Sequence, residues 1–141
     1  MPRCIEELSK RMNVELNEVD FTKLIETASP MKLNQYGGIR LSDVVDIGRH
    51  FDLFSNADSL RDFKKMKELF SQGLSKVFLL TERARNQEGE LHDLYHCSLV
   101  LDFPTDESLA IWSPLQNGQA QETVITKEEF ENLLGHFVVL I

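Results

Sequence analysis

The chain has 141 residues, of which 42% are hydrophobic and 27% are charged, a mixture typical of a globular domain. This length provides one hydrophobic core of ordinary size, so we expect residues 1–141 to form a single domain. The formal net charge of −8 argues against nucleic acid and anionic membranes as partners, because both carry charge of the same sign. A peptide or protein partner with a basic surface is favoured instead.

The sequence shows no targeting signal. No apolar run approaches the roughly 20 residues that span a bilayer, and the segment Met1 to Leu8 lacks the apolar stretch of a secretory signal. We therefore expect a cytoplasmic protein, with signal-independent secretion left open. The two cysteines, Cys4 and Cys97, are too few for a disulfide framework, and no Cys/His spacing fits zinc. We expect no metal and no cofactor.

Four apolar stripes at helical spacing predict that residues 1–74 are mainly helical. Ser42 is placed to cap the third helix, and Ser59 with Asp62 resembles a capping box at the start of the fourth. Gly73 is a suitable residue to end the fourth helix. The stripes consist of Ile5, Leu8 and Met12, then Phe21, Leu24, Ile25 and Ala28, then Val44, Val45 and Ile47, and finally Leu60, Phe63, Met66 and Phe70.

Residues 75–141 predict a sheet. The apolar run Val77–Leu80 suits a strand buried on both faces, and the polar segment Arg83–Asp93 predicts a mobile loop. From Tyr95 the pattern alternates, so that one face carries Tyr95, Cys97, Leu99, Leu101 and Phe103, and the other carries His96, Ser98, Val100 and Asp102. Further segments are a strand at Leu109–Trp112, a loop at Gln116–Gln121 and a terminal strand at His136–Ile141.

A helix is expected between the last two strands. Thr126 and Glu129 form a capping box before a stripe of Phe130, Leu133 and Leu134, and Gly135 is placed to end the helix. Helices followed by an antiparallel sheet define an α+β fold. The turn expected near Thr105 and Asp106 pairs residues whose numbers sum to about 210, which places Ser113 or a neighbour opposite His96.

The stretch from Tyr95 to Ile141 resembles the C-terminal half of the C39-like peptidases, a branch of the papain-like superfamily. In that family a histidine begins a strand, a second strand ends in Asp-Pro, and a capped helix and a short strand follow a glycine-containing loop. The matching segments here are His96 to Leu101, Leu109 to Pro114, Gly118, Thr126 to Glu131 and Gly135 to Leu140. Cys4 and the segment Gly38 to Asp43 are similar to features of the family's first half.

The resemblance implies a papain-like fold in which Cys4 is the nucleophile, His96 the base and Ser113 the residue in place of the orienting aspartate. A cysteine at a helix N-terminus has a lowered pKa, and a histidine must accept its proton. The sequence departs from the family pattern at three positions. Ser113 is not a carboxylate, Ile5 replaces a glycine, and none of the three residues before Cys4 is the family's oxyanion-binding glutamine.

Three functions follow as hypotheses. The first is a cysteine hydrolase that cleaves a peptide bond or a side-chain amide through Cys4 and His96. The second is a catalytically degenerate papain-like module that binds a protein or peptide. The third is an acidic inhibitor or immunity-type protein that blocks a basic partner through charge. In structural terms, Cys4 and His96 also have non-catalytic interpretations, as an unreactive thiol and as a hydrogen-bonded strand residue, and Cys97 is expected in the core.

Overall fold

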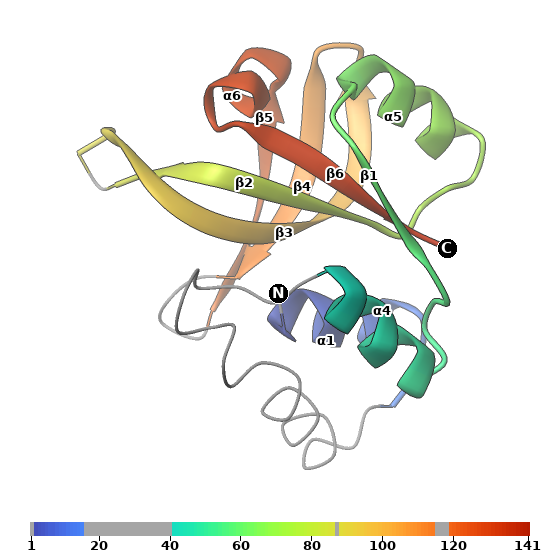
Figure 1. Cartoon of the computed structure of the whole chain (residues 1–141). Coiled ribbons are helices and arrows are strands. Elements are labelled where there is room, and N and C mark those ends of the chain that lie inside the picture. Colours follow the sequence, from blue (N-terminus) through green and yellow to red (C-terminus); the bar gives the residue numbers. More distant parts are fainter. Residues whose placement is uncertain (1, 16–40, 87, 115–118) are drawn as a thin grey trace.

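The computed structural model describes residues 2–15, 41–86, 88–114 and 119–141. These residues form a mixed α and β structure with one antiparallel sheet (Figure 1), which confirms the expected class. The sheet order is β1-β6-β2-β3-β4-β5. In chain order the elements are α1 (Pro2–Arg11), α4 (Leu41–His50), β1 (Ala57–Leu60), α5 (Phe63–Ser71), β2 (Val77–Arg85), β3 (Leu91–Thr105), β4 (Ser108–Pro114), β5 (Ala120–Thr126), α6 (Lys127–Asn132) and β6 (Gly135–Leu140).

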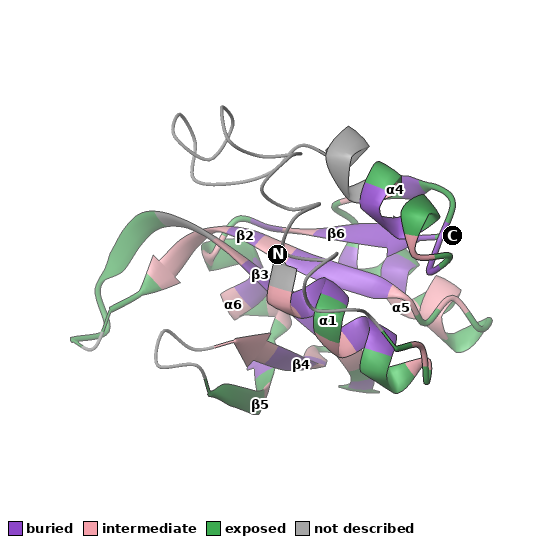
Figure 2. Ribbon diagram, turned by 90° about the horizontal axis from the view of Figure 1, so that it is seen from below, coloured by how far each residue is buried: buried purple, intermediate pink, exposed green. Residues whose placement is uncertain are grey.

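Helices cover both faces of the sheet. In Figure 1, α1 and α4 lie below the sheet and α5 and α6 lie above it. The lower core joins Cys4 and Ile47 from the helices to Phe78, Cys97 and Leu99 from the strands. In Figure 2 buried residues line the sheet and alternate with exposed ones on α1 and α4, as expected of amphipathic helices. Neighbouring residues of β3 point into different cores, since Leu99 belongs to the lower core and Val100 to the core on the opposite face.

The upper core is built around four phenylalanines. The Phe63 ring packs edge-on against Phe103 at 5.3 Å and against Phe130 at 5.4 Å between ring centroids. The Phe130 and Phe137 rings are stacked at 4.9 Å. Such ring pairs contribute about 0.5–1.5 kcal/mol each beyond the burial of their area. The cluster fixes α5 and α6 against the sheet.

Two of the predicted helix starts are stabilised by side-chain caps. The Thr126 hydroxyl accepts a hydrogen bond from the Glu129 amide at 3.1 Å, as the sequence predicts for α6. Asp62 is itself the N-cap of α5, because its carboxylate accepts from the Lys65 amide at 3.0 Å. Ser59 does not begin this helix but lies in β1. The sequence-based prediction was wrong there because β1 pairs with β6, a partner far away in the chain.

The segment Arg83–Asp93 is not a loop for most of its length. β2 continues to Arg85 and β3 starts at Leu91, and these two residues are paired. Figure 2 shows that this end of the two strands is largely exposed. Both of its faces are therefore polar, so the ladder forms without the hydrophobic alternation that signals a strand. Gly89 has φ 79° in the connecting turn, a value that suits glycine.

β5 was not predicted either. Its residues are exposed except Thr123 and Ile125, and it lies at the edge of the sheet with β4 as its neighbour. An edge strand that packs on few side chains carries a weak sequence signal. The predicted β3–β4 hairpin is confirmed by pairs such as Leu99 with Trp112. An irregularity between Val100 and Asp102 moves Phe103 to the upper core, opposite to the predicted face.

The predictions for the helical half are partly confirmed. α1 and α4 carry the first and third predicted stripes, whereas the second, Phe21 to Ala28, lies outside the described residues. α6 ends at Asn132, earlier than predicted, and Leu134 rather than a glycine has positive φ. Within the ranges that the structure describes, no helix combines the length and the apolar character needed to cross a membrane.

Candidate functional site

Cys4 lies in the first turn of α1, as predicted, and points toward the sheet. Its exposed fraction is 0%. The thiol donates a hydrogen bond to the carbonyl oxygen of Cys97 in β3 at 3.3 Å. Ile5 and Leu8 are buried beside it on the same face of the helix. The helix is therefore docked through an apolar stripe that includes Cys4, and solvent does not reach the thiol.

Cys97 is the residue of β3 that meets Cys4. Its side chain belongs to the same core, and both cysteines are free thiols. Burial raises the pKa of Cys97 well above its ordinary value. A hydrogen bond with Cys97 lowers the pKa of Cys4, and burial opposes that effect. The pair thus sits in an apolar interface, where Cys97 stays protonated at neutral pH. Cys97 has the core position that the sequence predicts.

His96 lies on the other side of the sheet. It is paired with Thr81 of β2 and lines a pocket on the face covered by α6. Burial lowers the pKa of His96, so its ring is neutral at neutral pH. Within the described part of the chain, no hydrogen bond satisfies the ring nitrogens. The structure does not bring His96 to Cys4, because neighbouring residues of β3 alternate between faces and Cys97 is the one that faces α1.

Ser113 lies in the same pocket as His96 but faces a different partner. The hydroxyls of Ser113 and Ser98 are 2.7 Å apart and share a hydrogen bond. The register of the hairpin pairs Leu99 with Trp112, so Ser113 stands beside Ser98 rather than His96. The sequence predicts Ser113 or a neighbour opposite His96, whereas in the structure Ser113 lies beside a residue two positions farther along β3. Strand alternation nevertheless places both predicted residues on one face.

The pocket that these residues line, which we call the His96 pocket, has a volume of about 410 Å³. One row of residues along its floor crosses four strands of the sheet. Leu79 of β2 pairs with Ser98 of β3, and Ser113 of β4 pairs with Gln121 of β5. Leu133, the residue that caps α6, lines it as well. Ser98 is 2% exposed and Thr81 is 6% exposed. Buried hydroxyls are thus concentrated under this pocket.

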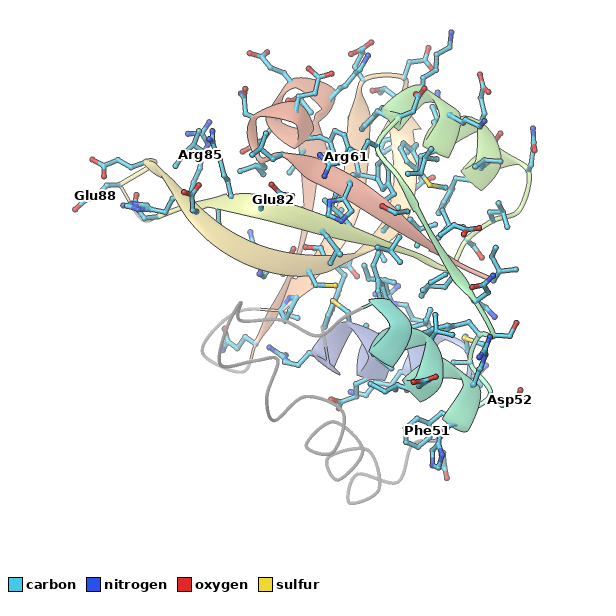
Figure 3. All side chains as sticks on the ribbon, in the orientation of Figure 1. Phe51, Asp52, Arg61, Glu82, Arg85 and Glu88 are labelled. Atoms are coloured by element: carbon cyan, nitrogen blue, oxygen red, sulfur yellow. The ribbon has the colours of Figure 1, made fainter. Side chains whose placement is uncertain are left out.

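Charged side chains border the His96 pocket. Arg83 and Arg85 come from the exposed end of β2, and Glu129 comes from α6. The Nε atom of Arg85 lies 3.7 Å from a carboxylate oxygen of Glu129, and Nε of Arg83 lies 3.5 Å from Asp93. Figure 3 shows Arg85 on the projecting part of the β2–β3 pair. The sequence pattern does not reveal the two arginines, because it predicts a loop over Arg83–Asp93, nor Thr81, which lies between that loop and the predicted strand Val77–Leu80.

The arrangement is suited to recognition. The His96 pocket offers hydroxyls, a neutral imidazole and two guanidinium groups, whereas the thiol nucleophile is buried on the opposite face. In the described ranges no three His, Cys, Asp or Glu side chains gather in a way that could hold a metal ion.

The chain was compared with known proteins at three levels. No protein-family model, no curated protein and no solved structure matches it. The resemblance to the C39-like peptidases therefore depends on the residues quoted from the sequence, and function must be argued from the arrangement of side chains.

Proposed function

We propose that this chain is a papain-like domain of the C39-like type that binds a protein or peptide without cleaving it. The observation that carries the proposal is the location of Cys4. The thiol is fully buried, and it donates its hydrogen bond to the Cys97 carbonyl instead of facing a base. In this proposal the helix that carries Cys4 belongs to the core, and the surface of the domain binds the partner.

A hydrolase requires a different arrangement around Cys4. The nucleophile and its base must be within hydrogen-bond reach, about 2.6–3.2 Å, or connected through one water. His96 lines the pocket on the other face of the sheet, and the hydroxyl of Ser113 bonds to Ser98. A hydroxyl also stabilises an imidazolium far less than a carboxylate does. No described contact favours the cysteine hydrolase or amidase over the binding module.

The net charge indicates the kind of partner. A chain with charge −8 attracts a basic protein surface and steers it over a distance of about 8 Å at physiological salt. The complex would thus weaken as salt is added. Inhibition of that partner, as in an acidic inhibitor or immunity-type protein, is one outcome of such binding. For its location we propose the cytoplasm, where the two free thiols remain reduced.

The proposal is tested with immobilised wild-type protein and a Cys4→Ser variant, each exposed to a random-sequence peptide mixture and read by mass spectrometry. We expect both to retain the same basic peptides uncut, with retention falling between low and high salt. Serine matches the size and hydrogen-bonding ability of cysteine, so the comparison isolates the thiol chemistry. Cleavage products that appear only with the wild type would contradict the proposal. Retention that stays unchanged across the salt range would contradict the proposal that the partner is basic.

A further inference from the structure

We propose that the His96 pocket is a binding site for a carboxylate group carried by a small polar ligand. This site does not depend on the proposed protein partner. Its volume of about 410 Å³ lies toward the small end of the usual range for ligand pockets. The cavity therefore fits a compact molecule, or the end of a chain, rather than a large cofactor.

The floor of the pocket combines hydroxyls with apolar side chains, whereas the rest of this face is apolar. Leu109, Phe103 and Val100 continue the same face of the sheet as a hydrophobic core. Under the pocket, by contrast, Thr81 and Ser98 place hydroxyls at buried positions. Burying a hydroxyl costs free energy unless it forms hydrogen bonds. The Ser98 hydroxyl already shares a hydrogen bond with Ser113, and these hydroxyls are further polar groups that a ligand in the cavity can use.

The sign of the charge at the pocket specifies the ligand further. The lining contains two arginines and one glutamate, and Asp93, the carboxylate that pairs with Arg83, is almost fully exposed and lies outside the lining. Arg83 contacts its carboxylate through Nε, and Arg85 contacts Glu129 through Nε and donates from Nη1 to the Gly89 carbonyl at 2.8 Å, so each guanidinium keeps further N–H donors. A carboxylate carries one negative charge and accepts two parallel hydrogen bonds from a guanidinium. It matches the pocket in charge and in geometry.

His96 orients the bound ligand in the pocket. Its ring is partly buried, lines the cavity and has no hydrogen bond within the described residues. A neutral imidazole presents one donor and one acceptor. The Ser98–Ser113 pair can likewise supply a donor or an acceptor to the ligand. These groups can contact the polar body of the ligand while the arginines hold its carboxylate.

The experiment measures binding of N-acetylglycine by NMR titration of the backbone amides, with N-acetylglycinamide as the uncharged match. We expect the acid to shift amides of β2, β3 and β4 at the pocket, and the amide to bind at least fivefold more weakly. Inorganic phosphate serves as the competing anion. Tighter binding of phosphate than of the acid, or equal binding of acid and amide, would overturn the proposal.

Variants locate the site. Arg83→Ala and Arg85→Ala should each weaken N-acetylglycine binding about three- to tenfold. Arg61→Ala is the matched control, because Arg61 forms a comparable pair with Glu82 at 3.6 Å outside the pocket (Figure 3). Glu129→Gln removes the negative charge from the lining and should strengthen binding about two- to fivefold, a gain that unfolding cannot produce. Equal losses in all three arginine variants, or weaker binding by the Glu129 variant, would refute the assignment.

A last comparison distinguishes two sources of the carboxylate, a peptide C-terminus and a free small molecule. N-acetyl-triglycine with a free C-terminus is titrated beside N-acetylglycine and beside the C-terminally amidated triglycine. Tighter binding of the longer acid, lost on amidation, supports a peptide C-terminus as the natural ligand. Equal binding of the two acids supports a free small carboxylate. Absence of saturable shifts at the pocket for either acid would refute the site.

Discussion

Gly135 provides a test of how α6 is held above the sheet. A Cβ atom added at this position would lie 2.6 Å from two ring carbons of Phe130 and 3.1 Å from its carbonyl oxygen. Phe130 is 3% exposed and stacks on Phe137. Its ring has little room to move. Replacing a glycine in a strand by alanine ordinarily stabilises by about 0.5–1 kcal/mol. Overpacking in a core costs about 1–3 kcal/mol.

The second effect is the larger, so we expect Gly135→Ala to lower the free energy of unfolding by about 1–2 kcal/mol. Urea denaturation followed by circular dichroism measures the change. The double variant with Phe130→Leu is the control, because a smaller side chain gives room for the new methyl group. The two substitutions should be non-additive, with Gly135→Ala costing less when Phe130→Leu is already present. A stabilised single variant, or strict additivity, would refute this account of the contact.

Two further predictions concern stability. Thr126→Ala should lower the free energy of unfolding by about 1 kcal/mol through loss of the cap on α6, while Thr126→Ser should be nearly neutral; equal losses in the two variants, measured by urea denaturation, would count against the cap. Burial lowers the pKa values of His96 and His136 below 6.5 in the folded protein, so the unfolded chain binds more protons as the pH falls. Stability should be greatest above about pH 6.5 and fall below it, and the His96→Gln variant should show a shallower fall. A denaturation midpoint that rises as the pH falls from about 7.5 to about 5.5 would contradict that sign.

Much of the fold could be predicted because its signals are local. The alternation that starts at Tyr95, the turn after Phe103 and the stop at Pro114 specify the β3–β4 hairpin, although its observed register places Ser113 beside Ser98 and not beside His96. The start of α6 follows from the capping residue Thr126. β1 and β5 lack such signals, because β1 is defined by pairing with a distant strand and β5 by its position at the edge. Their neighbours in space, rather than in the chain, determine their structure.

The candidate site likewise has features that local sequence signals predict and features that only tertiary packing determines. Alternation correctly groups His96 with Ser98, because side chains two apart on a strand share a face. It cannot decide which group faces α1, since helices cover both sides of the sheet and both groups include apolar residues. Leu99 enters the lower core and Val100 the upper one. The choice between His96 and Cys97 as the neighbour of Cys4 is therefore made by tertiary packing. The role of Gly135 also depends on tertiary packing, because the residue is required by its close contact with Phe130 and not by a left-handed φ.

The central claim is that Cys4 is a core residue and not a nucleophile, and the rate of its alkylation in the folded protein tests this most directly. Native protein is treated with iodoacetamide between about pH 5 and pH 8, and the modification of each cysteine is followed by peptide mass spectrometry beside a model thiol. A fully buried thiol reacts only when the structure opens, so Cys4 should react at least about a hundredfold more slowly than the model thiol at each pH. Cys97 should behave in the same way, and both should react fully in denaturant. Labelling of Cys4 as fast as the model thiol below about pH 7 would contradict the account and favour the hydrolase.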